Sequence, residues 1–230
     1  MAVAFKWRNA QDNNFVGSAT SINVGATSPA FSNGAFAAGD ILLASVTLNT
    51  GTGNSVTPPS GWTQIGAYQL DVNSFGTAYF WRLADGTESG SFTFTFGATS
   101  FACWTLIDYS GAAASPFDGT SVTSTYTGGA GTTTAITTIN AGDMLVLFIT
   151  SGGGVITVPS DMTTRFNALQ ESNTDTTSIS DRLPGSTGSF TESFTVASVG
   201  AGSYCFVALK PASAAAVSTP GILGLASSEW

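Results

Sequence analysis

An internal repeat constrains this chain more than any other feature of its sequence. The segment Val56–Thr63, VTPPSGWT, returns one hundred positions later as Ile156–Thr163, ITVPSDMT. A Gly-Asp pair followed by an apolar run precedes each copy, at residues 39–43 and 142–146. Landmarks that recur in the same order at a nearly constant offset indicate duplicated strand topology. The other matching landmarks are Arg82-Leu83 with Arg182-Leu183, Gly90–Thr93 with Gly188–Thr191, and Cys103-Trp104 with Cys205-Phe206.

The residue patterns between these landmarks are those of β-strands. Phe92, Phe94 and Phe96 alternate with polar residues, which places three rings on one face of a strand. Strand-length segments follow one another between Gly, Pro, Asn and Ser turns, and no useful helical period occurs. We therefore predict an all-β protein, a jelly-roll-like β-sandwich to which each half-repeat contributes about half of the strands. Two separate small sandwiches are the alternative.

The predicted organisation has four parts. An N-terminal strand and a covering loop occupy residues 1–36, the first half-repeat 37–119, the second 120–211, and an apolar C-terminal arm 212–230. Val3, Phe5 and Trp7 alternate with Lys6 and Arg8, as in a half-buried strand. This strand either starts the chain's own sheet or is an arm added to a neighbouring subunit.

Composition bears on the surface and on partners. Only 9% of the residues are charged, against about 25% in an ordinary soluble domain, so the exterior must consist largely of Ser, Thr, Gly, Asn and Ala. The net charge of −8 argues against nucleic acid as a partner. Subunit interfaces are depleted of charge at their centres, so we expect a homo-oligomer, with a trimer as the expected form. A monomer with a Ser/Thr-rich surface is the alternative. The predicted subunit contacts are Phe5, Trp7, Ile222, Leu223, Leu225 and Trp230.

The sequence shows no signal for secretion, for a membrane-spanning segment or for a disulfide framework. The N-terminus lacks a basic region followed by an apolar one, so no secretory signal is predicted. The longest apolar runs, 41–46 and 144–149, have strand length, far below the ~20 residues that span a bilayer. Cys103 and Cys205 stand at equivalent places in the apolar strands of the two halves and are expected to be buried free thiols.

The residue types argue against most catalytic chemistry. The chain has no histidine, which removes the commonest general base and metal ligand. Asp40 and Asp143 follow a glycine at strand starts, and Asp85 and Asp118 precede a glycine in turns, so all four are expected to bond nearby backbone. We predict no enzyme, no catalytic residue and no cofactor. A glycosidase would need a carboxylate pair, for which the candidates are Asp71 with Glu88 and Glu171 with Asp175.

Two kinds of binding stay open at this stage. Residues 49–54 and 71–73 contain Asn and Asp side chains that offer oxygen ligands to calcium, but without a dense acidic loop no metal site is predicted. Aromatic side chains stack on sugar rings when they are exposed, although core packing is the expected fate of most. The aromatic candidates are Tyr68, Phe75, Tyr79 and Tyr126.

Several short segments resemble a known kind of module. They are Gly-Asp-Ile-Leu-Leu-Ala at 39–44, Pro-Pro-Ser-Gly-Trp-Thr at 58–63, Tyr-Phe-Trp-Arg-Leu-Ala-Asp at 79–85, and Ile-Asp-Tyr-Ser-Gly at 107–111 followed by Ser-Pro-Phe-Asp-Gly at 115–119. Together they resemble β-sandwich modules of tailed-bacteriophage virion proteins and of some bacterial surface proteins, over roughly residues 37–210. The resemblance implies a non-enzymatic structural or adhesive component of the virion. Such a component would be a capsid decoration or part of a fibre or tail, in contact with another virion protein. The alternative is a carbohydrate-binding module that recognises a host glycan.

Overall fold

The computed structural model describes residues 2–9, 16–25, 36–49, 53–88, 91–170, 175–197 and 200–213. The first part contains β1 (Ala4–Asn9), β2 (Val16–Val24), β3 (Ile41–Leu48), β4 (Val56–Thr57), β5 (Thr63–Leu70), β6 (Gly76–Leu83) and β7 (Phe92–Ser110). The second contains β8 (Ala112–Phe117), β9 (Val122–Tyr126), β10 (Ala130–Thr132), β11 (Ile136–Thr138), β12 (Met144–Ser151), β13 (Ile156–Thr157), β14 (Thr163–Gln170), β15 (Asp175–Arg182), β16 (Gly188–Phe190), β17 (Ser193–Val196) and β18 (Gly202–Pro211). The described residues thus form strands and no helix, so they hold no helical segment that could cross a membrane.

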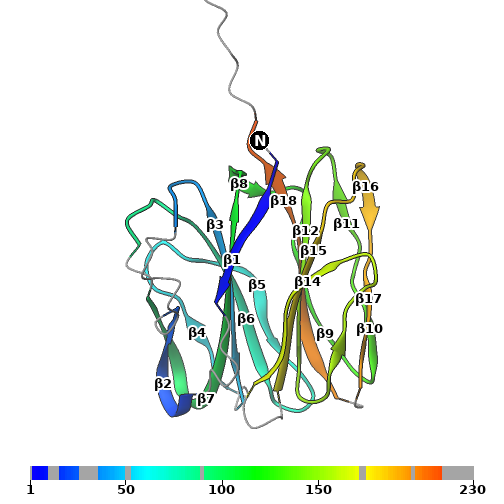
Figure 1. Ribbon diagram of the computed structural model, residues 1–230. Helices are drawn as coiled ribbons and strands as arrows, with labels where there is room; N and C mark the ends of the chain where they lie inside the picture. Colours follow the sequence, from blue (N-terminus) through cyan, green and yellow to red (C-terminus); the bar gives the residue numbers. More distant parts are fainter. Residues whose placement is uncertain are drawn as a thin grey trace, which may run out of the picture.

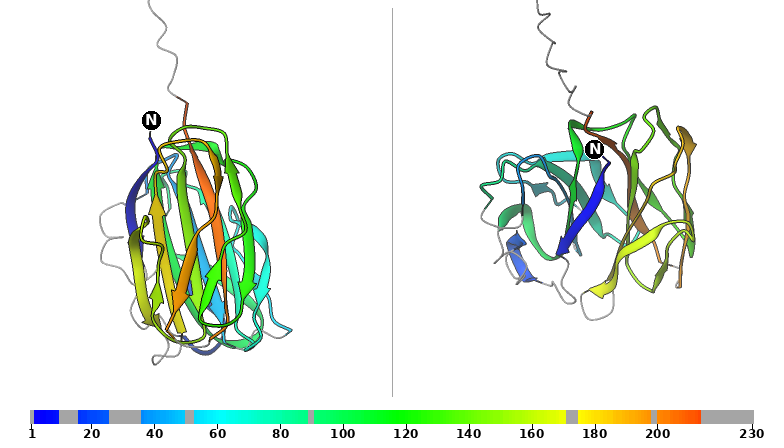
Figure 2. Two further views of the ribbon diagram at one scale, coloured as in Figure 1. Left: turned by 90° about the vertical axis from the view of Figure 1, so that its right-hand side faces the viewer. Right: turned by 45° about the horizontal axis from the view of Figure 1, so that its top comes forward.

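These strands build four layers, which lie side by side in Figures 1 and 2. One inner sheet has the order β1-β7-β3-β6-β5, and the other has the order β14-β15-β12-β18-β8, with β9 also on β18. Outside the first inner sheet, β2 and β4 pair with the first part of β7. Outside the second lie the sheets β10-β17-β13 and β11-β16. The all-β prediction is confirmed, and the arrangement is two small sandwiches packed against each other through their inner sheets.

Three hydrophobic cores separate the four layers. The first half-repeat has its own core around Trp62, Phe80 and Phe94, and the second has one around Leu147 and Phe206. Between the inner sheets lies a third core, which we call the central core. It is shared by both halves and contains Ile41, Leu43, Tyr79, Ile107 and Tyr109 with Val146, Phe148, Ile179, Cys205 and Val207. Because successive side chains of a strand point to opposite faces, the fully buried strands β3 and β12 each supply two cores at once.

The two halves share local structure at several matching landmarks. Gly39 and Gly142, which precede β3 and β12, adopt φ values of 90° and 92°, a conformation that favours glycine. After each proline corner the same bond forms: the Trp62 N–H donates to the Pro59 carbonyl at 3.3 Å, and the Met162 N–H donates to the Pro159 carbonyl at 3.1 Å. Trp62 and Met162 are both 7% exposed, so Met162 replaces Trp62 in the core of its half.

Two details differ from the sequence-based expectations. In the ladder, β3 pairs Thr47 with Cys103, and at the same place in the second half β12 pairs Thr150 with Ser203. Cys103 therefore corresponds to Ser203, and the predicted equivalence of the two cysteines is wrong, although both are buried free thiols. In addition, β8 lies before residue 119, where the first half-repeat was predicted to end. It nevertheless pairs with β18 and so belongs to the inner sheet of the second half.

Candidate functional site

One arginine in each half binds a buried glutamate at the end of its inner sheet. The Arg82 guanidinium lies 3.0 Å from Glu88, whose side chain is 1% exposed, and the Arg182 guanidinium lies 2.7 Å from Glu192, which is 3% exposed. Each arginine also lies over a ring, Arg82 over Phe92 and Arg182 over Phe190. Because these ion pairs recur at equivalent register positions in both halves, their role is structural. Glu88, a candidate for a carboxylate pair with Asp71, is thereby engaged by Arg82.

A cluster of one lysine and two aspartates anchors β1 to its own sheet. The Lys6 ammonium bonds the Asp40 carboxylate and lies 3.7 Å from Asp108. Asp40 also accepts the Ala37 N–H at 2.8 Å, as expected for a residue at a strand start. The Asp108 side chain is fully buried, and neither of its oxygens receives a hydrogen bond. Burial and repulsion from Asp40 raise the pKa of Asp108 to about 7, although Lys6 opposes the shift.

The second half has a carboxyl pair at the corresponding strand start. Asp118 accepts the backbone N–H groups of Ile139 at 2.6 Å and Asn140 at 3.0 Å, more than twenty residues away. Asp143 is fully buried and interacts with the Asp118 carboxyl group. Of the two acids, Asp143 is therefore the one that is more easily protonated. Burial and the Asp118 charge raise the pKa of Asp143 to about 7; for Asp118, hydrogen bonds outweigh burial and lower the pKa to about 2. The expectation of bonding to nearby backbone is therefore wrong for Asp118.

This pair predicts an unusual pH dependence of stability. The pKa of Asp143 is about 7 in the folded chain and 3.8 for an ordinary aspartate, so folding takes up a proton between these pH values. The free energy of unfolding should therefore fall as pH rises from about 4 to about 7. Asp143→Asn, which keeps a donor for Asp118, should remove about 2 kcal/mol of this fall. Thermal midpoints between pH 4 and pH 8 test this, with the exposed Asp85→Asn as control. An equally steep profile for both variants would refute the assignment.

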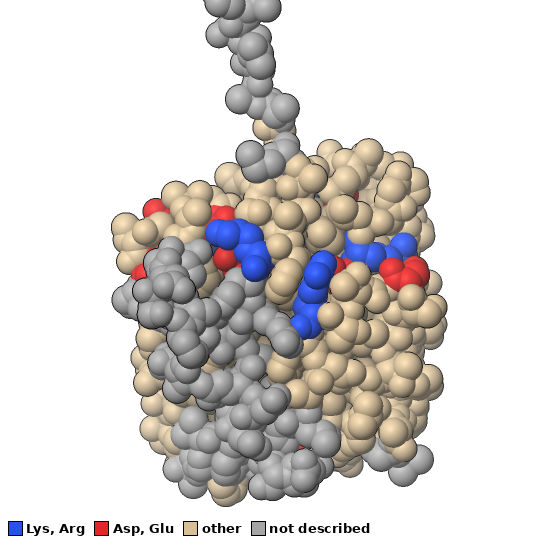
Figure 3. Space-filling view, in the orientation of Figure 1, with Lys and Arg blue, Asp and Glu red and all other residues tan. Residues whose placement is uncertain are grey.

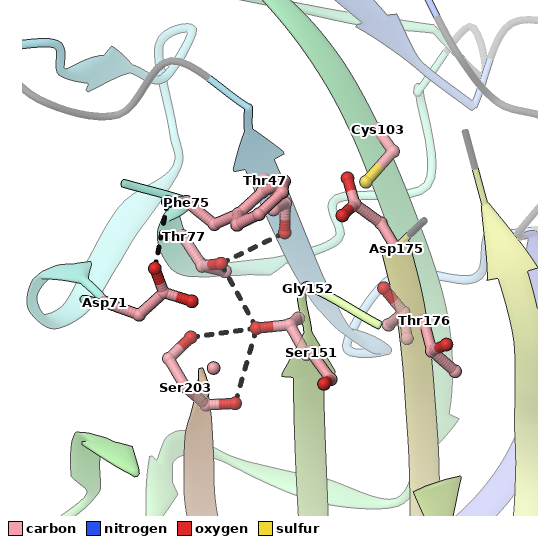
Figure 4. A pocket seen from close by; sticks show the side chains of 13 residues that line it. Thr47, Asp71, Phe75, Thr77, Cys103, Ser151, Gly152, Asp175, Thr176 and Ser203 are labelled. Carbon is pink, nitrogen blue, oxygen red and sulfur yellow. Dashed lines mark hydrogen bonds between the residues drawn. The ribbon is translucent and has the colours of Figure 1, made fainter. Parts of the chain in front are cut away.

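A small cavity lies between the inner sheets at their lower end, where β3 and β12 finish (Figure 4). We call it the inter-sheet cavity. Its volume is about 10 Å³, which is room for roughly one water-sized particle. Both halves contribute to its wall, and none of the lining residues is basic. The lining residues are Thr47, Asp71, Phe75, Thr77, Cys103, Thr150, Ser151, Gly152, Asp175, Thr176, Thr177, Gly202 and Ser203.

A continuous chain of hydroxyl groups runs along this cavity from one sheet to the other. The Thr47 and Thr77 hydroxyls are 3.1 Å apart, and Thr77 reaches Thr150 of the opposite sheet at 3.2 Å. Thr150 contacts the Ser203 hydroxyl at 2.9 Å, and Ser203 contacts the Tyr79 hydroxyl at the same distance. Because the strand ladders satisfy the backbone, these hydroxyls are free to bond across the central core. They fix the relative position of the two sandwiches.

Asp71 faces the cavity with one carboxyl oxygen. Its Oδ1 accepts the N–H groups of Asn73 at 2.8 Å and Phe75 at 3.0 Å, which holds the β5–β6 turn. Its Oδ2 is buried and has no hydrogen-bond partner. Figure 4 shows this oxygen directed toward the hydroxyl chain. Burial raises the pKa of Asp71 although the two backbone bonds oppose it. Asp175 contributes a second carboxyl group to the wall and is 4% exposed. Glu171, predicted as its partner, lies outside the described residues.

The other predicted site residues are distributed as follows. Tyr79 is 1% exposed and Tyr126 is 8% exposed, so both rings fill cores, as expected for most of the aromatic candidates. Tyr68 packs against the first core, and Phe75 borders the inter-sheet cavity. Of the segments considered as sources of calcium ligands, residues 50–52 lie outside the described part, and Asn54 bonds the Ala98 backbone.

The predicted subunit contacts are only partly described. Phe5 packs on Tyr109 with ring centroids 6.0 Å apart, and Arg165 lies over its other side at 4.4 Å, so Phe5 belongs to the central core. The backbone of Trp7 pairs with Asp108 in β7 of the same chain, so β1 starts the chain's own sheet. Ile222, Leu223, Leu225 and Trp230 lie outside the described residues.

Sequence reasoning missed the inter-sheet cavity because its wall is made of ordinary Thr and Ser positions. The one available signal was Asp71 after an apolar strand end. Within the described part of the chain, no group of three or more His, Cys, Asp or Glu residues is arranged to hold a metal ion. Comparison with protein-family models, with curated proteins and with solved structures finds no match for this chain.

Proposed function

We propose that this protein is a non-enzymatic structural or adhesive component of a tailed-phage virion, a capsid decoration or a part of a fibre or tail, which acts as a homo-oligomer. In this role the two sandwiches form a rigid block whose surfaces adhere to copies of the chain and to another virion protein. Burial of apolar surface at about 25 cal/mol per Å² supplies the adhesion. The phage assignment rests on the resemblance of the repeat segments, and the adhesive role rests on the surface described next.

The observation that carries the proposal is the apolar lower end of the molecule. Leu70, Val72, Phe101 and Val155 are exposed there, and Val72 is 75% exposed. They come from three separate segments, namely the end of β5 with its following turn, β7, and the residue before β13. The sheets bring these segments to one end, opposite the end at which β1 begins and β18 finishes (Figure 1). Most of the face drawn in Figure 3 is likewise uncharged, and its basic side chains lie beside acidic ones or stand singly. Exposed apolar groups on a surface so poor in charge are typical of contact sites.

The lower end provides a direct test of assembly. Val72→Ser/Val155→Ser changes exposed side chains, so it should leave the thermal midpoint nearly unchanged. If these residues bury against another subunit, the double variant should lose about 2 kcal/mol or more of association, at least a 30-fold weakening. Size-exclusion chromatography with light scattering measures the oligomer, and purified particles are then probed for the chain. The control is Ile139→Ser, which is 78% exposed at the opposite end. A wild-type chain that stays monomeric at every concentration, or a double variant that assembles normally, would refute the proposal.

Glycan recognition is the second candidate, and one observation favours it. A groove of about 390 Å³ crosses the outer sheet of the second half, lined by hydroxyl groups of Thr132, Thr157, Ser160, Ser193 and Thr195. Hydroxyls can bond a sugar, but the aromatic ring in this groove, Phe194, is only 3% exposed and offers little stacking surface. A glycan array separates the candidates, since binding would favour the second and a blank array the first.

A further inference from the structure

We propose that the side chains of Lys6 and Asp40 join in a covalent amide bond within the folded chain, with loss of one water, and that Asp108 carries a proton during this reaction. The bond would be a self-made modification that links β1 to the start of β3. It goes beyond the adhesive role proposed above and does not depend on it. The amine, the acid and the proton carrier all belong to this chain, so the reaction needs no further reactant.

The first argument is the placement of the reacting pair. Strand β7 lies between β1 and β3 in the inner sheet, so the Lys6 side chain has to cross β7 to reach Asp40. It does so, and its Nζ is in direct contact with Oδ2 of Asp40. Lys6 is the inserted residue of a β-bulge, a feature that re-aims side chains and recurs beside active sites. Asp40 is buried and accepts the Ala37 N–H, which fixes its carboxyl group. Groups held together in this way react as if one were present at about 10⁵–10⁸ M.

The second argument is a buried acid that packing does not explain. Asp108 of β7 lies 3.7 Å from the Lys6 ammonium, and neither of its buried oxygens receives a hydrogen bond. In the ladder Asp108 pairs with Leu42, and at the same place in the second half Leu145 pairs with Ala208. The repeat therefore folds with alanine at this position, whereas a buried acid without a donor is costly. Transfer of a proton gives this acid a role that packing does not.

The third argument is the protonation of the three groups. Burial and repulsion from Asp40 raise the pKa of Asp108 to about 7, although Lys6 opposes the shift. Near neutral pH, Asp108 is therefore able both to donate and to accept a proton, as general acid–base catalysis requires. Burial lowers the pKa of Lys6, but the two carboxyl groups outweigh burial and raise it. The resting state is thus an ion pair, and we expect the bond to form slowly after folding.

The reaction is balanced in atoms and charge. The Lys6 ammonium first passes one proton to the Asp40 carboxylate, which leaves an amine beside a neutral acid. The nitrogen lone pair attacks Cγ of Asp40, and an N–C bond forms. Asp108 donates its proton to the departing hydroxyl group and takes one back from the nitrogen, the C–O bond breaks, and water leaves. The Lys6 side chain is 32% exposed, which gives this water a path to solvent.

The product also removes two costs of the unreacted site. A neutral amide replaces the ion pair beside buried Asp108, so less charge is held away from water. Its remaining N–H is a donor for Asp108, which receives no hydrogen bond in the unreacted site. The bond closes a covalent loop from residue 6 to residue 40, and such a loop restricts the unfolded chain in the same way as a disulfide.

Intact-mass spectrometry of the full chain tests the bond. The wild type is kept folded at neutral pH until its mass is constant, and it should then be lighter than its sequence by one water, about 18 Da. Lys6→Arg keeps a positive charge for Asp40 but has no primary amine, so it should have the full mass. Its thermal midpoint should be lower by roughly 5–15 °C. The matched control is Lys210→Arg, at the only other lysine of the sequence, which should keep both the mass loss and the midpoint.

Digestion with trypsin locates the bond. The sequence places cleavage sites at Lys6, Arg8 and Arg82, with none between the last two. An amide on Lys6 blocks cleavage there, so the wild type should yield a branched peptide in which residues 1–8 are joined to residues 9–82. Lys6→Arg should yield these peptides separately.

The contrary outcomes are equally definite. A wild-type chain that keeps its full mass would show that Lys6 and Asp40 form an ordinary salt bridge, and the proposal would be wrong. A loss of water that persists in Lys6→Arg would place the reaction elsewhere, for instance in cyclisation at the Asp-Gly pairs 85–86 and 118–119. Asp108→Ala, which copies the residue of the second half, should keep the full mass while circular dichroism shows it folded. Normal bond formation in this variant would refute the role of Asp108, and the first two measurements decide the bond without it.

Discussion

Phe148→Ala should destabilise the whole molecule, including the half-repeat that does not contain it. Phe148 is 2% exposed in the central core and meets Tyr79 of the opposite sheet edge to face, with ring centroids 6.0 Å apart. Truncation of a buried phenylalanine removes its apolar contacts and leaves a cavity, which costs about 3–5 kcal/mol. Because the central core joins the two sandwiches, this loss should appear in both.

The distribution of tryptophan makes that coupling measurable. The five tryptophans stand at positions 7, 62, 81, 104 and 230, so none lies between residues 105 and 229, where Phe148 is located. In a urea titration, tryptophan fluorescence should therefore follow the first half and circular dichroism the whole chain. In Phe148→Ala we expect the unfolding midpoints of both signals to shift together to a lower urea concentration. In the exposed control Ile139→Ser both midpoints should stay unchanged. A fluorescence midpoint that does not move, with a separate earlier transition in circular dichroism, would mean that the halves unfold independently.

Arg165→Met is expected to have the second large effect. Asp181 of β15 is 1% exposed and has two partners, the Arg165 guanidinium and the Tyr109 hydroxyl, both at 2.8 Å. The substitution keeps an apolar chain over Phe5 but leaves a buried carboxylate with a single neutral donor. Breaking a buried ion pair from one side costs about 3–5 kcal/mol. The urea midpoint at neutral pH measures the loss.

A double variant shows whether the loss arises from the stranded charge. Arg165→Met/Asp181→Asn removes both charges and retains a group that Tyr109 can bond, so it should recover most of the stability. Tyr109→Phe, which deletes one hydroxyl, should cost only about 1–1.5 kcal/mol. Equal losses in the single and the double variant would show instead that the guanidinium contributes through its contact with the Phe5 ring.

The strands and the duplication could be read from the sequence because both depend on local patterns. The apolar runs at 41–46 and 144–149 lie in β3 and β12 and start where these strands start, since an apolar run after turn residues indicates where a strand begins. The Phe92, Phe94 and Phe96 stripe lies in the core as expected. Comparison of the two halves fails where they have diverged. Phe148 corresponds by register to Ser45, and Ser45 bonds the Thr105 hydroxyl at 2.6 Å instead of filling a core. The repeat in the sequence therefore does not reveal the central core.

The sequence by itself determined that this protein is all-β, that it consists of two equivalent halves, and that its surface carries few charges. These properties follow from periodicity, recurrence and composition, which neighbouring residues define. Only the tertiary structure decided that the halves meet through their inner sheets, that Asp143 is buried beside Asp118, and that Asp71 faces a cavity whose lining also includes Asp175. The physical reason is that burial and electrostatic partners depend on which faces pack together, and alternation along a strand defines its two faces without specifying what covers either of them.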